Sequence, residues 1–210
     1  MSLAAHDGAG ADPAQALPRS IRFTELPRQP LDQGRGSARE IWADLDPDLS
    51  LRWQLRLIDI RDSAGLLVGP AGTNHFVVGL AGPQVAVRNF GSNRVLRRDQ
   101  VLPVPSSTVQ FERPKLRPPG ASSLLVLTFA DVAHPPGFSI HTVDPDTDAT
   151  ADLGAGAQLV VALRGTVRVQ GGEVGPGSAL LLDPAERYRP LAAAHLLTVH
   201  RPGAAGAENG

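Results

Sequence analysis

The sequence predicts an all-β protein built from two similar β domains in tandem. The stretch from Phe76 to Val87 (FVVGLAGPQVAV) is repeated from Leu159 to Val169 (LVVALRGTVRV) if one gap is allowed at Pro83. Short runs of strand-forming residues recur about every 8 to 12 residues, with glycine and proline between them, as in β-sandwiches and β-barrels. No stretch sustains the i, i+3, i+4 apolar spacing of an amphipathic helix.

Each copy of the repeat predicts a β-hairpin. An apolar strand leads to a glycine, at Gly82 or Gly165, and an alternating second strand follows. A glycine between two strands is typical of a tight turn. The repetition therefore predicts two superposable hairpins, one in each domain.

The run from Leu51 to Ile60 (LRWQLRLIDI) alternates apolar and polar residues as a half-buried strand does. Beyond Leu57 the alternation breaks, because Ile58 and Ile60 are apolar on the polar face. Two interpretations stay open: that end of the face is covered by other elements, or it lines a cavity.

Domain boundaries follow from composition. Residues 1–18 and 203–210 are rich in alanine, glycine and proline without periodicity, which predicts disordered tails. Three prolines between residues 109 and 120 favour a crossing between domains. We therefore predict a first barrel over residues 19–105 and a second over residues 106–202.

Composition excludes several classes of function. The net charge of the 210 residues is −1, which gives no reason to expect binding to nucleic acid or to an anionic membrane. The absence of cysteine removes disulfides, thiolate metal sites and cysteine nucleophiles, and is compatible with a reducing compartment. No segment has the length of apolar sequence that a membrane span needs. The sequence thus predicts a cytoplasmic protein and is compatible with a homodimer.

The second half resembles part of a cupin barrel. The residues that carry the likeness are the repeat from Val160 (VVALRGTVRV) and the later run from Gly177 to Pro184 (GSALLLDP). Together with the first copy of the repeat, they make the chain similar to a bicupin. The resemblance implies two jelly-roll β-barrels.

The first half resembles the HutD/Ves family of bicupins over about residues 25–105. Pro30 to Ile41 (PLDQGRGSAREI) is similar to the family signature P-W-x-N-G-G-G-x-T-R-E-I, and RWQLRLIDI with Gly65 and Gly72 follows in the family's order. This sequence departs from the family at five positions of these motifs. The family tryptophan is Leu31, its asparagine is Gln33, the arginine after Trp53 is Gln54, the serine is Arg56, and the arginine before the hairpin is His75. The resemblance implies binding of a small metabolite linked to histidine utilisation, without a demonstrated reaction.

Metal chemistry is the alternative function. Most cupin enzymes hold a metal with an H-x-H pair, a glutamate and a later histidine. No two of the six histidines form an H-x-H pair: His6, His75, His134, His141, His195 and His200. We therefore predict no metal and no cofactor. The alternative is a metal-dependent isomerase or dioxygenase that uses unusual ligands, such as His75 with His134 or His141.

No catalytic constellation is visible, so the sequence favours a binding protein over an enzyme. Arginine binds carboxylates through a planar fork, and the mouth of a small barrel is a common ligand site. The predicted ligand is a small carboxylate metabolite. The polar residues predicted to converge on it are Gln33, Arg39, Arg56, Asn74 and His75. Arg39 carries most weight, because it keeps both residue type and spacing in the family signature; the competing interpretation is that Arg39 braces the glycine bend before it.

Overall fold

The computed structural model describes residues 20–89, 91–113, 120–146, 151–152, 157–169, 172–182 and 187–200. Both predicted disordered tails, residues 1–18 and 203–210, lie outside these ranges. Within them the chain is almost entirely β-strand, and its one helical segment is the 3₁₀ turn η1 (Phe23–Glu25). This confirms the all-β prediction. The described residues contain no helix of the length and hydrophobicity that a membrane span requires.

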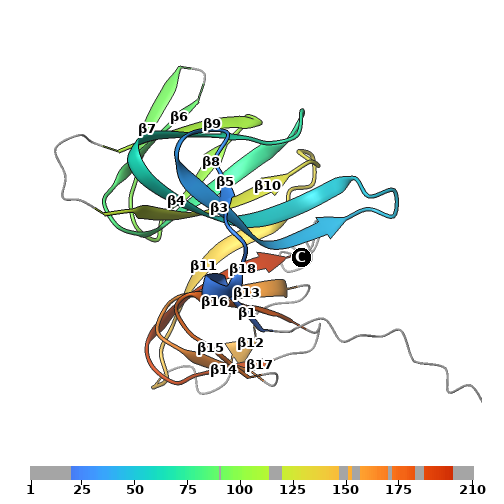
Figure 1. Cartoon of the computed structure of the whole chain (residues 1–210). Coiled ribbons are helices and arrows are strands. Elements are labelled where there is room, and N and C mark those ends of the chain that lie inside the picture. The colour runs from blue at the N-terminus through green and yellow to red at the C-terminus, as the bar shows by residue number, and fades with distance from the viewer. Residues whose placement is uncertain are drawn as a thin grey trace, which may run out of the picture.

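The upper part of the molecule in Figure 1 is one strongly curved antiparallel sheet. Its strands are β2 (Gln29–Pro30), β3 (Gln33–Leu45), β4 (Leu51–Val68), β5 (Asn74–Ala81), β6 (Val85–Asn89), β7 (Ser92–Leu96), β8 (Val101–Val104), β9 (Thr108–Glu112) and β10 (Ser122–Phe129). The main order is β7-β6-β9-β4-β10-β5-β8, with β3 beside β4 and β2 beside β3. We call these strands the first half.

The lower part contains two smaller sheets, which we call the second half. Its strands are β1 (Ser20–Arg22), β11 (Gly137–Val143), β12 (Ala151–Asp152), β13 (Ala157–Arg164), β14 (Val167–Val169), β15 (Gly172–Val174), β16 (Ser178–Leu181), β17 (Arg187–Pro190) and β18 (Ala194–His200). One sheet has the order β1-β16-β13-β18-β11 and the other the order β12-β17-β14-β15. The N-terminal strand β1 therefore completes a sheet made from the C-terminal part of the chain.

The strand order of the first half recurs in the second. The first half contains the strand orders β8-β5-β10-β4 and β7-β6-β9-β4. The second half contains the corresponding orders β16-β13-β18-β11 and β15-β14-β17-β12. The long strand β4 ends both orders in the first half, whereas in the second half β11 ends one order and β12 ends the other. Thus the repeat in the sequence reflects two units of the same topology.

The prediction that each copy of the repeat forms a hairpin is wrong, because its two strands do not pair with each other. The two copies nevertheless lie at equivalent places in the two halves. β5 pairs with β10 and β8, and β6 pairs with β7 and β9, so the two strands are not neighbours. The same holds for β13 and β14. At Gly82 (φ +85) and Gly165 (φ +70) the chain crosses from one layer of its unit to the other. A Cβ there would collide with the carbonyl oxygen of Ala121 or Ala193, at the start of the last strand of each unit.

Strand pairing does not follow the boundary predicted at residue 105. β9 and β10 pair with β4, so the first half extends to Phe129. The segment predicted as the crossing begins inside β9, and its residues 114–119 lie outside the described ranges. Strand β10, which falls inside the second barrel predicted over residues 106–202, is buried on both faces as the strand between β4 and β5 of the first half.

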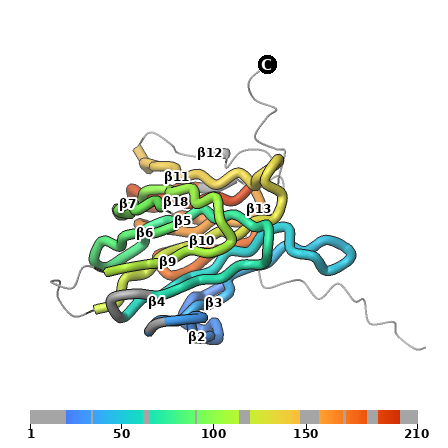
Figure 2. Tube along the Cα trace, turned by 90° about the horizontal axis from the view of Figure 1, so that it is seen from above, coloured from blue at the N-terminus to red at the C-terminus, as the bar shows by residue number. Residues whose placement is uncertain are grey.

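The two halves share a hydrophobic core. Trp53, Leu55 and Leu57 of β4 pack in one cluster with residues of β13 and β18, among them Leu159 and Val199. Ile58 and Ile60 point the other way and are fully buried in the core enclosed by the first half. The break in the alternation therefore marks a covered end of the strand. A third cluster fills the second half, and Figure 2 shows the two halves from above.

Candidate functional site

Three polar side chains from adjacent strands meet inside the first half. Thr128 lies on β10, directly opposite His75 of β5, and Arg56 of β4 lies opposite Val126. Because alternate residues of a strand share a face, these three point to the same side as Val126, which belongs to the core enclosed by the first half. We call Arg56, His75 and Thr128 the inner polar corner.

His75 is held as a neutral ring in this corner. It is buried, and its Nδ1 lies 2.9 Å from the Thr128 hydroxyl oxygen. Burial lowers the pKa of His75 to about 4, an effect that Arg56 reinforces and the Ser107 backbone partly opposes. Its Nε2 is buried, and the Ser107 backbone beside the ring raises the pKa as a hydrogen-bond acceptor does.

Arg56 has unused donors. Its Nη2 donates a long hydrogen bond of 3.4 Å to the Thr128 hydroxyl, and its buried Nε has no partner. Burial also lowers the pKa of Arg56, while Asp32 and Glu40 act in the opposite sense. Glu40 lies directly opposite Arg56, but its carboxylate accepts from Gln54. Within the described residues Arg56 therefore has no carboxylate paired with it.

The hydrogen-bond pattern assigns the protons. The Thr128 oxygen accepts from Arg56, so its own hydrogen is free to go to Nδ1 of His75. A neutral imidazole has one N–H, which then lies on Nε2. The corner thus offers the Arg56 Nε–H, which has no partner, and beside it the His75 Nε2–H, whose neighbour is the Ser107 backbone. This arrangement of donors suits an anion.

The other three predicted site residues lie elsewhere. Gln33 is exposed at the start of β3, and Asn74 lies on the opposite face of β5 from His75. Arg39 is buried, and its Nη2 donates to Asp59 at 2.8 Å while Nη1 donates to the Phe23 carbonyl at 3.3 Å. The structure therefore brings together Arg56 and His75 but not Gln33, Arg39 or Asn74. The sequence analysis missed Thr128, whose one signal was a polar residue in an otherwise apolar run.

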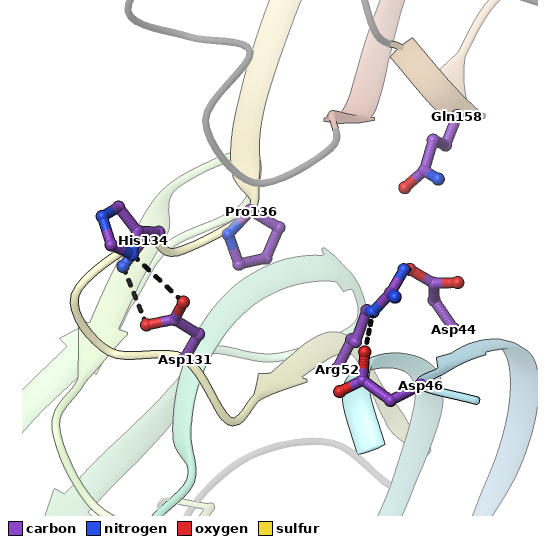
Figure 3. Close-up of a pocket in the computed structure, with 7 residues that line it drawn as sticks. All are labelled: Asp44, Asp46, Arg52, Asp131, His134, Pro136 and Gln158. Atoms are coloured by element: carbon purple, nitrogen blue, oxygen red, sulfur yellow. Dashed lines mark hydrogen bonds and ion pairs between the residues drawn. The ribbon is translucent and has the colours of Figure 1, made fainter. Parts of the chain in front are cut away.

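A cavity of about 500 Å³ lies where the two halves meet. Figure 3 shows the residues that line it: Asp44, Asp46, Arg52, Asp131, His134, Pro136 and Gln158. Arg52 pairs with Asp46 and lies 3.8 Å from Asp44. Since its arginine already has two carboxylates and its walls carry a third, this cavity is a poor site for an anion.

Asp131, which lines the same cavity, forms hydrogen bonds within the loop between β10 and β11. Its Oδ1 accepts from the backbone N–H of Ala133 and of His134, each at 3.0 Å, and its Oδ2 lies 3.2 Å from Nδ1 of His134. The bond from the His134 backbone does most to lower the pKa of this carboxyl group. The carboxylate thus organises the connection from β10 to β11.

The inner polar corner does not fit the metal centre of a cupin enzyme. His75 is its single imidazole, and the described residues contain no group of three histidine, aspartate or glutamate side chains placed to hold an ion. A catalytic zinc site takes three protein ligands. The Arg56 guanidinium beside His75 would also repel a cation. The donor set of this corner is that of an anion site.

No protein-family model matches the chain, and no curated protein matches it in sequence. Its fold is nevertheless similar to solved structures. HutD from Pseudomonas fluorescens SBW25, solved in a formate condition, has a TM-score of 0.67 at 20% identity and covers 88% of this chain and 98% of its own. A conserved protein of unknown function from Pseudomonas aeruginosa has a TM-score of 0.68 at 22% identity, with 87% and 97% covered.

A more distant match is the bacterial pirin YhhW from Escherichia coli in complex with nickel(II). Its TM-score is 0.58 at 9% identity, and 87% of this chain and 98% of the pirin are covered. These likenesses confirm the fold that the sequence resemblance implied, a HutD-like cupin.

Proposed function

We propose that this chain, a HutD-like cupin in fold, binds a small carboxylate metabolite in the inner polar corner and needs no metal to do so. The observation that carries the proposal is the state of Arg56. Its guanidinium is largely withdrawn from water, its Nε has no partner, and no carboxylate of the described residues pairs with it. An unpaired, desolvated cation is costly unless an anion completes it.

His75 supports the same ligand. Because its pKa is about 4, it stays neutral at physiological pH and carries its one N–H on Nε2. A neutral donor next to the arginine fork adds a hydrogen bond without adding charge repulsion. Arg56 is the more accessible of the two, so it makes the first contact and His75 lies behind it.

We further propose a cytoplasmic role linked to histidine utilisation. The support is the likeness in fold to HutD and the similarity of residues 30–41 to the family signature. The ligand would then be one of the carboxylates formed as histidine is degraded.

Isothermal titration calorimetry tests the proposal. Histidine, urocanate, glutamate, glutarate and acetate are titrated into the full chain purified without an affinity tag. At least one should bind, and Arg56→Gln should weaken it about ten- to a hundred-fold, because one charge-assisted hydrogen bond contributes about 1.5–3 kcal/mol. Arg56→Lys should recover little, since a point charge does not replace a planar fork.

Arg52→Gln is the matched control. Arg52 lies four residues earlier on the same strand, but it faces the cavity between the halves and is paired with Asp46. Its loss should leave carboxylate affinity unchanged. Equal affinity of the wild type and Arg56→Gln would refute the assignment of the site. Binding that requires added Ni²⁺ or Fe²⁺ and disappears in His75→Gln would instead favour the metal-dependent alternative.

A further inference from the structure

The second half carries a polar cluster of its own, on different residues. Ser139 and His141 lie on β11, and Thr198 and His200 lie on β18. Ser139 is directly opposite Thr198, and His141 is opposite Leu196, in a ladder without a register shift. All four share the face of Leu196, which belongs to the core of the second half.

The two histidines converge on one hydroxyl group. Nε2 of His141 and Nε2 of His200 each lie 3.0 Å from the Thr198 hydroxyl oxygen, so the two nitrogens are at most about 6 Å apart. Nε2 of His141 is also 2.9 Å from the Ser139 hydroxyl, which lies 3.1 Å from that of Thr198. Thr198 is fully buried, whereas His141 is exposed at the rim.

The hydrogen bonds can be satisfied with both Nε2 lone pairs facing the hydroxyls. Each hydroxyl group has one hydrogen to donate, and two such hydrogens serve two imidazole nitrogens. Each ring then carries its own hydrogen on Nδ1. Burial and the nearby His200 lower the pKa of His141, which favours the neutral ring with its lone pair intact.

The space around His200 depends on a glycine. Gly137 lies directly opposite His200, and a Cβ at this position would come within 2.9 Å of the His200 Cβ. A side chain at residue 137 would therefore push the ring of His200 away from Thr198. The absence of one lets the ring lie against Gly137 of β11 while its Nε2 contacts Thr198.

We propose that His141 and His200 together bind one divalent transition-metal ion, such as Zn²⁺, Ni²⁺ or Cu²⁺, through their Nε2 atoms at the mouth of the second half. Neutral imidazole is the commonest protein ligand for such ions. Metal–nitrogen bonds of about 2.0–2.1 Å require the two nitrogens to lie within about 4 Å of each other, so the exposed His141 ring turns toward His200 as the ion binds. Water fills the remaining positions, so the ion is exchangeable.

This site differs from the metal centre of most cupin enzymes, which uses an H-x-H pair. His141 and His200 lie on two separate strands, β11 and β18, and form no such pair. It also differs from the inner polar corner, where Arg56 lies beside the single histidine. The hydrogen bonds of the second-half cluster join its four side chains to one another, and none of those four is an arginine or a lysine.

Titration of Zn²⁺, Ni²⁺ and Cu²⁺ into the tag-free, metal-stripped chain tests the proposal, with calorimetry for stoichiometry and thermal melts for stabilisation. We expect about one ion per chain and a rise in melting temperature, because a ligand that binds only the folded state stabilises it. His141→Gln and His200→Gln should each weaken binding by more than about tenfold. His141 is exposed, so its variant keeps the fold even if His200→Gln does not.

His134→Gln and His75→Gln are the controls, since one histidine is exposed on a loop and the other lies in the first half. Both should bind the ion as the wild type does. Electron paramagnetic resonance of the Cu²⁺ form gives a second reading, with two coordinating imidazole nitrogens in the wild type and one in His141→Gln. The proposal fails if no ion binds, or if His141→Gln changes neither the affinity nor the number of coordinating nitrogens.

Discussion

Arg39 and Asp59 form an ion pair between β3 and β4, with Nη2 of the arginine 2.8 Å from Oδ2 of the aspartate. The pair is mostly buried, with side-chain exposures of 9% and 15%. Asp59 also accepts from the Ser123 hydroxyl at 2.6 Å, and Arg39 donates to the Phe23 carbonyl. These contacts tie β3, β4, β10 and the η1 turn together, so the arginine that best matches the family signature has a structural role.

The first prediction follows from this pair. Arg39→Ala should lower the free energy of unfolding by about 1.5–3 kcal/mol, because it leaves the Asp59 carboxylate without its cation. Carboxylate affinity measured by calorimetry should stay unchanged, while urea unfolding should report the loss. If Arg39→Ala is as stable as the wild type but no longer binds the carboxylate, Arg39 belongs to the binding site.

His75 predicts a dependence of stability on pH. An exposed histidine has a pKa near 6.5 and folded His75 has one of about 4, so between these values the unfolded chain binds more protons than the folded chain. Stability should therefore be complete above about pH 6.5, fall as the pH decreases toward 4, and lose about 3 kcal/mol from this residue by then.

His75→Asn isolates that effect, because asparagine does not titrate and its amide can replace Nδ1 as a partner of Thr128. Urea unfolding at pH 7, 5.5 and 4 should show a smaller decrease in this variant than in the wild type. His134→Asn, which removes an exposed histidine, should lose as much stability as the wild type between pH 7 and pH 4. If the wild type and His75→Asn lose stability in parallel, His75 is not buried as a neutral ring.

Asp99 joins the two halves through charge. Its Oδ2 lies 2.6 Å from Nη2 of Arg164 and 3.3 Å from Nδ1 of His195, both in the second half. Asp99→Asn should lower stability by about 1 kcal/mol, a modest amount because Arg164 is 45% exposed. Asparagine tolerates the backbone at this residue, where φ is +56, so the change tests the charge alone.

The control for Asp99 is Glu173→Gln. Glu173 pairs with Arg168 at 2.5 Å within the second half, and both side chains are more than half exposed. Its loss should change stability little. The midpoints of urea unfolding of Asp99→Asn and Glu173→Gln are compared at low and at high salt. If the two variants lower the midpoint equally, Asp99 does not couple the halves.

The two crossing glycines, Gly82 and Gly165, predict a fourth effect on stability. Gly82→Ala and Gly165→Ala should each cost more than about 2 kcal/mol, because a Cβ adds a collision with backbone to the strain of a positive φ. Gly91→Ala is matched in φ at +86 but has nothing within 4 Å of its added Cβ. It should cost about 1 kcal/mol by strain alone, and thermal melts that rank all three alike would show that the close approach is unimportant.

Much of the fold could be predicted because it depends on local patterns. Alternation from Leu51 to Leu57 fixed a strand with one apolar face, and that face packs against the other half. The repeat around Gly82 and Gly165 revealed two equivalent units, since the same crossing needs the same residues in each. The pairing within each unit was not predictable, because a turn glycine fits both a hairpin and a crossing between layers.

The candidate sites depend on contacts that no local pattern contains. Arg56 and Thr128 are 72 residues apart and share a hydrogen bond, and Ser139 and Thr198 are 59 apart. The sequence places His195 and His200 on one strand, but only the pairing of β11 with β18 brings His141 to His200. Sequence alone determined that the chain is a two-unit β-protein without a standard metal motif. The tertiary structure decided which side chains meet, because strand order sets the neighbours of each side chain and burial sets its charge.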